Sequence, residues 1–277
     1  MTPSTHPLFW RDADLPFVEL RQVLDGRGVS YSPHTHEEWS IGAILEGQSE
    51  FLCADRLHKV ERGALVMMNP DEVHACNPDQ GSPWGYYMMH INKKWLTQHL
   101  FEQGIRADLQ WQDTRVDTVL SKAFYDDFVL LCERLMSTEY RSKEKAFFLK
   151  GYFFQLFTYL DITEKVATLL PANKLYNVAD YLNTHCLQDT PIEDISAEFG
   201  FSTAHFVRAF KRHFNMTPHA YRLNKRIQLG QQALKQGHDI ADIAQAVGFS
   251  DQAHFQRVFK KRVAATPHQY RRSISSL

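Results

Sequence analysis

Short runs of β-forming residues follow one another between residues 18 and 91. Glycine-bearing turns divide several of these runs. Short strands at frequent intervals are typical of a β-sandwich or a small barrel, and such a barrel can enclose a cavity for a small ligand. The predicted strands are Val18–Leu24, Trp39–Leu45, Ser49–Ala54, Ala64–Met68 and Trp84–Ile91.

Apolar residues at helical spacing replace this pattern beyond residue 117. The segment 146–160 is apolar on more than one face, which predicts a helix buried either in the core or against another subunit. We expect the helices near 117–160 to form a dimer surface and a relay between domains. The two predicted stripes are Leu120, Phe124, Leu131 and Leu135, and Leu149, Phe153, Leu156 and Leu160.

The C-terminal part contains an internal repeat with an initial offset of 48 residues and one later insertion. Three blocks in the same order and register indicate one supersecondary unit that is built twice. The aligned segments are 192–202 with 240–250, 204–211 with 253–260, and 217–222 with 266–271.

Each copy has the pattern of a helix-turn-helix. In the first copy, Thr190 and Glu193 form a predicted capping box, with Pro191 at the first helical position. Gly200 then supplies a turn, and Ser202 is placed to cap a second helix. The second copy repeats the turn at Gly248 and the caps at Asp239 and Ser250. The predicted buried residues of the two second helices are Phe206, Phe210 and Phe214, and Phe255 and Phe259.

The opposite face of each second helix carries the candidate DNA-contacting residues. Arg and Gln can read guanine and adenine edges in a major groove, and Lys and Arg can also hold phosphates. These residues are Thr203, Ala204, Val207, Arg208 and Lys211 in the first copy, and Gln252, His254, Gln256, Arg257 and Lys260 in the second.

The segment between the two copies predicts one long helix. Thr217 can cap it, Pro218 suits its first turn and Gly237 suits its end. A helix of about 19 residues is roughly 28 Å long, close to the ~34 Å of one DNA turn. The segment therefore predicts a rod that holds two reading helices against successive major grooves.

Composition agrees with a folded chain of two domains. The chain has 277 residues, of which 44% are hydrophobic, and this argues against extended disorder. No apolar run approaches the roughly 18 residues of a membrane span, and the first residues do not resemble a secretory signal. The four cysteines lie far apart, so we expect reduced thiols in a cytoplasmic protein rather than disulfides or a zinc knuckle.

Charge divides the chain at Pro171. Residues 171–277 hold 14 Lys and Arg against 8 Asp and Glu, a net charge of +6. The remainder holds 17 against 24, a net charge of −7. A basic part beside an acidic part suggests two separate roles, one of which involves a polyanion.

Residues 174–277 closely resemble the DNA-binding domain of AraC/XylS-type bacterial transcription regulators. This resemblance implies a seven-helix domain with two helix-turn-helix units that binds double-stranded promoter DNA. It also implies that base reading falls to Ala204, Val207 and Arg208 in the first unit, and to Gln252, His254 and Arg257 in the second. The matching marks are Gly200-Phe201-Ser202, Phe206-x-Arg208-x-Phe210-Lys211, Thr217-Pro218, Gly248-Phe249-Ser250, Phe255-x-Arg257-x-Phe259-Lys260 and Thr266-Pro267-x-x-Tyr270-Arg271.

The N-terminal half resembles the cupin-like sensor domain of these regulators. Gly28, His34, His36 and Gly47 fall at the spacings of the first cupin motif, but Ser40 stands where the motif has a ligating glutamate. The second motif is matched only loosely, with spacings off by a residue, by Gly63, Pro70, His74 and Asn77.

Three histidines at these positions could bind a divalent metal as neutral imidazoles. The missing glutamate and the irregular second motif argue against a catalytic centre, so we expect no metal, no cofactor and no catalytic residue. We expect these residues to line a pocket for an organic effector instead. Its predicted residues are His34, His36, Glu38, Trp39 and His74.

Together these features predict an α+β protein of two domains: an N-terminal cupin-like β-barrel with flanking helices, and a C-terminal all-α domain with two helix-turn-helix units. The expected function is sequence-specific transcription regulation by a cytoplasmic homodimer that responds to a small-molecule effector and is not an enzyme. The predicted parts are an effector domain at 1–110, a helical dimerisation or linker region at 111–170 and a DNA-binding domain at 171–277. Within the last part, the predicted elements are helix-turn-helix units at 190–214 and 239–263 and a linker helix at 218–236.

Two alternatives remain open at this stage. One is a metal-dependent cupin enzyme fused to a DNA-binding domain. The other is an effector-independent dimeric activator whose barrel only dimerises. The sequence predicts no membrane partner, and a contact with RNA polymerase is possible. It does not identify the effector or the target promoter, and it does not distinguish an activator from a repressor.

Overall fold

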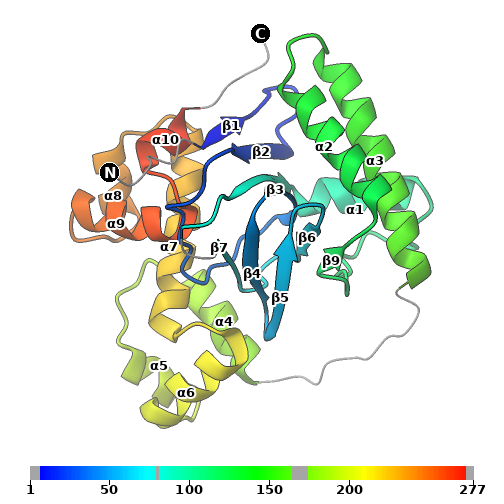
Figure 1. The fold of residues 1–277 in the computed structure, drawn as a ribbon. Coiled ribbons are helices and arrows are strands. Elements are labelled where there is room, and N and C mark those ends of the chain that lie inside the picture. Colours follow the sequence, from blue (N-terminus) through cyan, green and yellow to red (C-terminus); the bar gives the residue numbers. More distant parts are fainter. Residues whose placement is uncertain (1–6, 79–80, 164–173, 273–277) are drawn as a thin grey trace.

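The computed structural model describes residues 7–78, 81–163 and 174–272. Its first half contains two antiparallel sheets (Figure 1). The larger sheet has the order β1-β2-β8-β3-β6-β9 and the smaller the order β5-β4-β7. The strands are β1 (Leu8–Trp10), β2 (Val18–Val23), β3 (Trp39–Glu46), β4 (Gln48–Cys53), β5 (Arg56–Glu61), β6 (Leu65–Met68), β7 (His74–Pro78), β8 (Gly85–Ile91) and β9 (Thr118–Val119).

The chain passes from one sheet to the other at Gly47, between β3 and β4. Gly47 has a φ of +82°, and a Cβ there would lie 1.7 Å from the carbonyl oxygen of Pro83. Only glycine fits such a close approach of two backbones. The two sheets do not join into one continuous barrel, so the cupin-like fold is an open one with two sheets.

Alternate residues of the larger sheet contribute to two different cores. Trp39, Ile41 and Ala43 lie in the core that includes residues of α1 (Lys93–Glu102), α2 (Lys122–Met136) and α3 (Ser142–Thr163). Ile44, Val66, Met68 and Met88 share the other core with residues of the smaller sheet. Residues of the second core line a cavity.

The predicted helical stripes are confirmed with one exception. Leu149, Phe153, Leu156 and Leu160 are all fully buried on α3. Leu120, in contrast, precedes α2 and is 78% exposed, so its place in the first stripe was wrong. The reason is that α2 begins only at Lys122, after the short strand β9.

Seven helices make up the described part of the C-terminal half, as the family resemblance implied. The linker helix α7 lies between two three-helix groups (Figure 1). None of the helices in the described ranges combines the length and apolar character needed to cross a membrane. The seven are α4 (Lys174–Thr184), α5 (Ile192–Glu198), α6 (Thr203–Phe214), α7 (Pro218–Lys235), α8 (Ile240–Ala246), α9 (Gln252–Val263) and α10 (Pro267–Arg271).

One buried arginine of α7 connects the two helix-turn-helix units. Arg226 donates hydrogen bonds to the carbonyl oxygens of Cys186 (2.6 Å) and Gly248 (2.5 Å) and to the carboxylate of Asp189 (2.8 Å). Hydrogen bonds from a charged group are stronger than neutral ones. Arg226 therefore fixes the turn of the second unit against the end of α4.

The predicted helix ends are partly correct. Thr217 caps α7 through the N–H of Ala220, and Asp239 caps α8 through the N–H of Ala241. Gly200 and Gly248 take the positive φ that their turns require.

Two predicted caps were wrong, and a third is correct in position only. No capping box forms at Thr190, because Pro191 is the N-cap of α5 and makes no side-chain cap. Ser202 is at the N-cap of α6 but makes no side-chain bond there. Asp251, not Ser250, caps α9 through the N–H of His254.

Candidate DNA interface and interdomain cavity

The second helix of each unit presents a mostly exposed polar face. None of the exposed polar side chains among the predicted readers donates or accepts a hydrogen bond within the described ranges, so these groups are available to a partner. The exposed readers are Ala204, Arg208 and Lys211 on α6, and Gln252, Gln256, Arg257 and Lys260 on α9.

Three predicted readers are held by the protein itself. The hydroxyl of Thr203 shares a 3.1 Å hydrogen bond with Ser196. Val207 is partly buried against the core of the first unit. The ring of His254 packs edge-on against Phe249, with 5.2 Å between centroids. These side chains contact the rest of their own units, and the exposed arginines and glutamines remain the candidate polar readers.

The two units lie at opposite ends of α7 (Figure 1). This helix has 18 residues and is therefore about 27 Å long at ~1.5 Å per residue. The length is close to one turn of DNA, about 34 Å.

The N-terminal domain contacts α7 through Thr35. Asn224 donates hydrogen bonds to the carbonyl oxygen (3.1 Å) and the hydroxyl (2.9 Å) of Thr35. Gln228, one helical turn further along α7, donates to the same carbonyl oxygen at 2.8 Å. All three residues are buried, so this contact is a specific one between the domains.

A buried carboxylate makes a second contact between the domains. Glu19 on β2 forms ion pairs with Arg11 (2.6 Å) and with Lys235 at the end of α7 (2.9 Å), and it accepts a hydrogen bond from the hydroxyl of Tyr270 (3.2 Å). Burial alone would raise the pKa of Glu19. The charges of Lys235 and Arg11 outweigh burial and hold this pKa far below its usual range.

The C-terminal end of α9 makes a third contact. Arg21 on β2 donates to the carbonyl oxygens of Val263 (2.6 Å) and Ala264 (3.2 Å). The N–H of Ser32 donates to the carbonyl oxygen of Lys261 at 3.0 Å. The N-terminal domain therefore holds the same helix whose exposed face is predicted to read DNA.

A cavity of about 110 Å³ lies among these contacts. Its apolar wall comes from the inner faces of both sheets, and its polar wall comes from β2, from the segment around Thr35 and from α7 and α9. Because both domains contribute, a ligand in this cavity would touch both. Its apolar residues include Ile44, Phe51, Val66, Met68, Trp84 and Met88.

Four of the five residues predicted for effector binding line this cavity, namely His34, His36, Glu38 and His74. Trp39 instead lies fully buried in the other core, with its ring 5.9 Å from that of Phe153 on α3. The alternation of side chains along β3 explains this, because Trp39 and its neighbour Ser40 point to opposite faces of the sheet.

The histidines of the cavity form a row with His90 at one end. The ring centroids are 4.4 Å apart for His34 and His74, 4.6 Å for His74 and His36, and 4.7 Å for His36 and His90. Ser40 links the last two, at 3.3 Å from Nε2 of His36 and 2.6 Å from Nδ1 of His90. Burial lowers the pKa of all four rings, to about 3 for His74 and His90.

This row does not have the geometry of a metal centre. The Nδ1 atoms of His34, His36 and His74 each lie within 3.0 Å of a backbone carbonyl oxygen, which leaves Nε2 as the available atom. Among the described residues, however, no three imidazole nitrogens lie within 4.8 Å of one another. The row is better suited to hydrogen bonding with an organic ligand.

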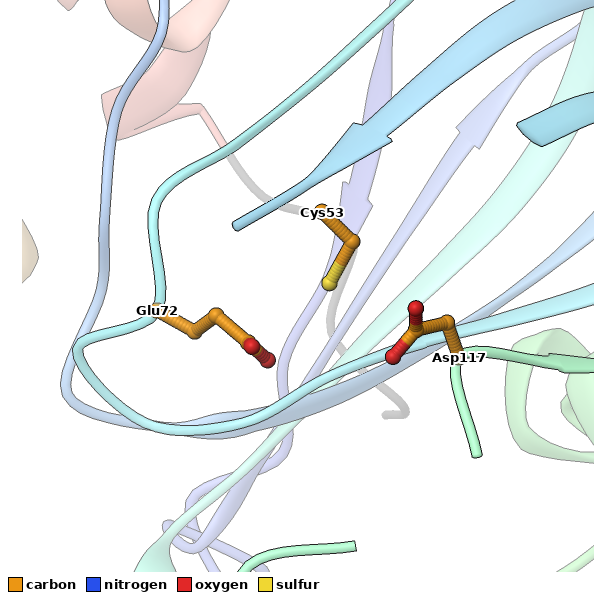
Figure 2. A group of neighbouring side chains, drawn as sticks. All are labelled: Cys53, Glu72 and Asp117. Atoms are coloured by element: carbon orange, nitrogen blue, oxygen red, sulfur yellow. The ribbon is translucent and has the colours of Figure 1, made fainter. Parts of the chain in front are cut away.

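One group elsewhere brings potential ligand atoms together: Cys53, Glu72 and Asp117 (Figure 2). Arg56 already binds both oxygens of Asp117, at 2.5 and 2.8 Å, and also reaches Glu72 at 3.2 Å. Burial raises the pKa of the Cys53 thiol, which disfavours the thiolate that metals prefer. The group is therefore an ion-pair junction that fastens β9 to the smaller sheet.

Comparison with known proteins agrees with this arrangement. The model of the AraC-like ligand binding domain matches residues 17–157, and that of a helix-turn-helix domain matches residues 195–273. The chain is an AraC-family transcription regulator. It joins a ligand-binding domain to a DNA-binding domain, and the cavity lies between them.

Relatives of this regulator are similar over most of their length. The HTH-type transcriptional regulator YbfI of Bacillus subtilis is 26% identical over 221 residues, which are 79% of each chain. The lactose operon transcription activator of Staphylococcus xylosus is 20% identical over 230 residues, which are 80% of each chain.

Among solved structures, ToxT of Vibrio cholerae has the same fold. An apo form of ToxT with one substituted residue aligns with a TM-score of 0.57 and 14% identity, over 92% of this chain and 96% of ToxT. Wild-type ToxT with a bound unsaturated fatty acid aligns with a TM-score of 0.53 and 15% identity, over 96% of this chain and 93% of ToxT.

Sequence reasoning missed most of the polar cavity wall of the AraC-family regulator. Glu19 and Arg21 alternate with the apolar Val18 and Leu20 along β2, and His90 stands between Met89 and Ile91 on β8. Charged residues in an alternating strand usually face solvent. Here they face the C-terminal domain, which the pattern of one strand does not reveal.

Proposed function

We propose that this transcription regulator binds its effector in the interdomain cavity, and that the bound effector changes the placement of the DNA-binding domain. The observation that supports this proposal is the composition of the cavity wall, which takes residues from both domains. A ligand that contacts both domains binds their arrangements unequally, and this difference is what allosteric control requires.

Thr35 offers a direct route from the cavity to α7. It lies between His34 and His36, which both line the cavity, and its own polar groups bind Asn224 and Gln228. A ligand that shifts either histidine therefore shifts the residue that holds α7. Because α7 carries a helix-turn-helix unit at each end, such a shift alters the position of both units.

A metabolite screen tests this proposal. In a thermal-shift assay of the full chain, a ligand that binds the folded state raises the melting temperature. The same ligand should change the affinity for promoter DNA in a mobility-shift assay. If no compound in a broad library raised the melting temperature, the effector-independent activator would be the better interpretation.

The predicted readers give a test of DNA recognition. We propose that Arg208 on α6 and Arg257 on α9 contact bases, with Thr203, Ala204, Val207, Lys211, Gln252, His254, Gln256 and Lys260 completing the interface. Replacing either arginine with alanine should weaken specific binding by about 1–3 kcal/mol and relax the sequence preference. Binding should also weaken steeply as salt increases, because phosphate contacts release counterions.

Fluorescence anisotropy with specific and scrambled DNA would measure this effect. Lys59→Ala on β5 is a suitable control, since it removes one exposed positive charge of the N-terminal domain outside α2 and α3. An equal loss on both DNA sequences would assign the arginine to phosphate contacts. Unchanged binding for both arginine variants would contradict the assignment of α6 and α9 as reading helices.

We propose that the protein forms a homodimer through α2 and α3. Phe147 and Phe154 are 74% and 42% exposed, and they lie seven residues apart on one face of α3. Phe147→Asp with Phe154→Asp should shift the full chain toward monomer in light scattering coupled to chromatography. Leu187→Asp, at a 51% exposed leucine of the C-terminal half, should not. A wild-type chain that remained monomeric at high concentration would contradict the dimer.

The remaining parts of the proposal concern the cellular location of the protein and the roles of its regions. We propose that the protein acts in the cytoplasm, with the parts 1–110, 111–170 and 171–277 as its sensing, dimerising and DNA-binding regions; the Pro171 boundary lies outside the described residues. We assign no catalytic step to the cavity, because its histidines are arranged in a row rather than around a centre. A contact with RNA polymerase would accompany activation.

A further inference from the structure

We propose that the interdomain cavity binds a small neutral ring compound, whose two neighbouring O–H or N–H groups donate hydrogen bonds to His34 and His74. This inference rests on the proposed function, because it takes the cavity as the effector site. It adds the polarity, the charge and the size of the ligand, and it names the two residues that recognise its polar groups.

His34 and His74 are held side by side by their own backbones. The N–H of His34 donates to the carbonyl oxygen of His74 at 3.1 Å, and the N–H of His74 donates to that of His34 at 2.9 Å. This antiparallel bridge brings the two rings to 4.4 Å between centroids. The rings are therefore neighbours, and one small ligand can reach both.

Each of the two rings is also fixed in one tautomer. Nδ1 of His34 lies 3.0 Å from the carbonyl oxygen of Ser32, and Nδ1 of His74 lies 2.8 Å from that of Glu72. A carbonyl oxygen only accepts hydrogen bonds, so Nδ1 carries the proton in both rings. Burial lowers the pKa of both imidazoles, which keeps them neutral. Nε2 is then a hydrogen-bond acceptor in each ring.

Both Nε2 atoms open onto the cavity that the two residues line. Neither atom has a hydrogen-bond partner within the described ranges, and neither is among the unpartnered side-chain atoms that are sealed from solvent. His36 is not a third open acceptor, because the hydroxyl of Ser40 lies 3.3 Å from its Nε2. The wall thus presents one pair of fixed acceptors, and a ligand complements them with two donors.

The ionic groups of the wall already balance one another. Acidic and basic side chains line the cavity in equal number, and the histidines between them are neutral. An ionic ligand would add an uncompensated charge to this buried space, which is costly, whereas a neutral one would not. The acidic residues are Glu19, Glu37 and Glu38, and the basic residues are Arg21, Lys235 and Arg262.

The apolar wall and the volume define the body of the ligand. Ile44, Phe51, Val66, Met68 and Met88 form an apolar surface inside the two sheets. The cavity measures about 110 Å³, and a cavity of about 150 Å³ is enough for benzene. The body is thus about the size of one six-membered ring, and two adjacent substituents on such a ring place two donors side by side.

The acceptor on His34 belongs to a short segment that holds both helix-turn-helix units. Two residues before it, the N–H of Ser32 donates to the carbonyl oxygen of Lys261 on α9 at 3.0 Å. One residue after it, Thr35 accepts the hydrogen bonds of Asn224 on α7. A ligand bound to His34 therefore acts on the segment that joins the N-terminal domain to α7 and to α9.

Isothermal titration of the full chain with a series of equal shape tests this proposal. Catechol carries two adjacent donors, 2-methylphenol carries one and 1,2-dimethylbenzene carries none. Each donor replaced by a methyl group should weaken binding by about 10-fold, because an acceptor of the wall is then left unpaired. Equal affinity across the series would overturn the proposal, and so would the absence of catechol binding.

Two further conditions test the charge of the ligand and the role of metal ions. Benzoate, an anion with acceptors only, should bind more weakly than catechol. A chelating agent should leave catechol binding unchanged, because the two imidazoles bind the ligand directly. Tighter binding of benzoate would overturn the proposal, and so would a loss of catechol binding in the chelator.

A set of variants locates the acceptors. His74→Phe keeps a ring but removes the acceptor, so catechol should bind about 10-fold more weakly while 1,2-dimethylbenzene binds as before. His34→Phe should have the same effect. His99→Phe is the matched control, because His99 is also buried and bound to a backbone carbonyl oxygen, but it lies on α1 and its free nitrogen is sealed from solvent. Unchanged catechol affinity in both cavity variants would overturn the proposal, and so would an equal loss in His99→Phe.

The outcomes also separate this inference from the proposed function. If catechol bound as expected but left the affinity for promoter DNA unchanged, the chemistry of the cavity would stand and its regulatory role would be contradicted. If a metabolite without donors bound in the cavity and changed the affinity for DNA, the proposed function would stand and the present inference would be overturned.

Discussion

The buried histidines His74 and His90 are expected to reduce the free energy of unfolding by about 4 kcal/mol together when the pH falls from 7 to 5. Burial lowers the pKa of His74 and His90 to about 3, against 6.5 for an unperturbed histidine. Below pH 6.5 the unfolded chain therefore binds protons that the folded chain does not. Each of these histidines then costs about 2 kcal/mol of stability over this pH interval.

Other titratable groups in the cavity add to this loss, offset part of it, or act at a lower pH. The pKa values of His34 and His36 are also lowered, so they add to the loss. Burial raises the pKa of the Glu38 carboxyl, so its protonation favours the folded state and offsets part of the loss. Glu19, with its lowered pKa, loses its stabilising effect only as the pH falls below about 4.5.

Urea unfolding at pH 7, 6 and 5 would measure this dependence. His74→Asn should remove about 2 kcal/mol of the difference between pH 7 and pH 5. His238→Gln, at an exposed histidine beyond the end of α7, should leave the difference unchanged. A stability that stayed constant from pH 7 to 5 would show that these rings are not held neutral in the folded chain.

Replacing Glu19 with glutamine is expected to destabilise the protein by about 3 kcal/mol at pH 7. The substitution keeps the shape but removes the anion that pairs with Arg11 and Lys235. It leaves the mostly buried Arg11 without its carboxylate partner. The side chain of Lys235 is about a third exposed, so water can solvate its ammonium group once Glu19 is neutral. The expected destabilisation therefore lies at the lower end of the range for a broken buried ion pair.

A double-mutant cycle with Lys235→Met would isolate the contact between the domains. Asp126→Asn is a matched control, because Asp126 pairs with Lys122 on the exposed surface of α2. Surface pairs of this kind contribute less than about 1 kcal/mol. A loss for Glu19→Gln no greater than that of the control would mean that Glu19 does not hold the domains together.

Local patterns in the sequence were sufficient to predict much of the fold. The five predicted strands and the fully apolar stripe of α3 are present because each depends on short-range periodicity. β5 was missed because its sequence, Arg-Leu-His-Lys-Val-Glu, has only two apolar residues and lies at the edge of the smaller sheet. α1 was missed because polar and apolar residues do not separate clearly along Lys93–Glu102.

The candidate cavity was predictable only in part. Histidines 34, 36 and 74 were found because a family motif marks their spacing. Arg262 was missed because it belongs to the buried face of a predicted reading helix, and only the packing of the two domains brings it to the cavity. Contacts between residues more than two hundred positions apart, such as Arg21 with Val263, produce no pattern in the local sequence from which they could be predicted.

The attachment of α9 at its C-terminal end has a consequence for engineering. Arg21 and Ser32 bind backbone carbonyl oxygens there, so these contacts do not depend on the identity of the exposed side chains of α9. A chimera that grafts another regulator's recognition surface onto this sensor can thus replace the outward-facing residues of α9 freely. It must retain Asn224 and Gln228, because their side-chain amides donate the buried hydrogen bonds to Thr35.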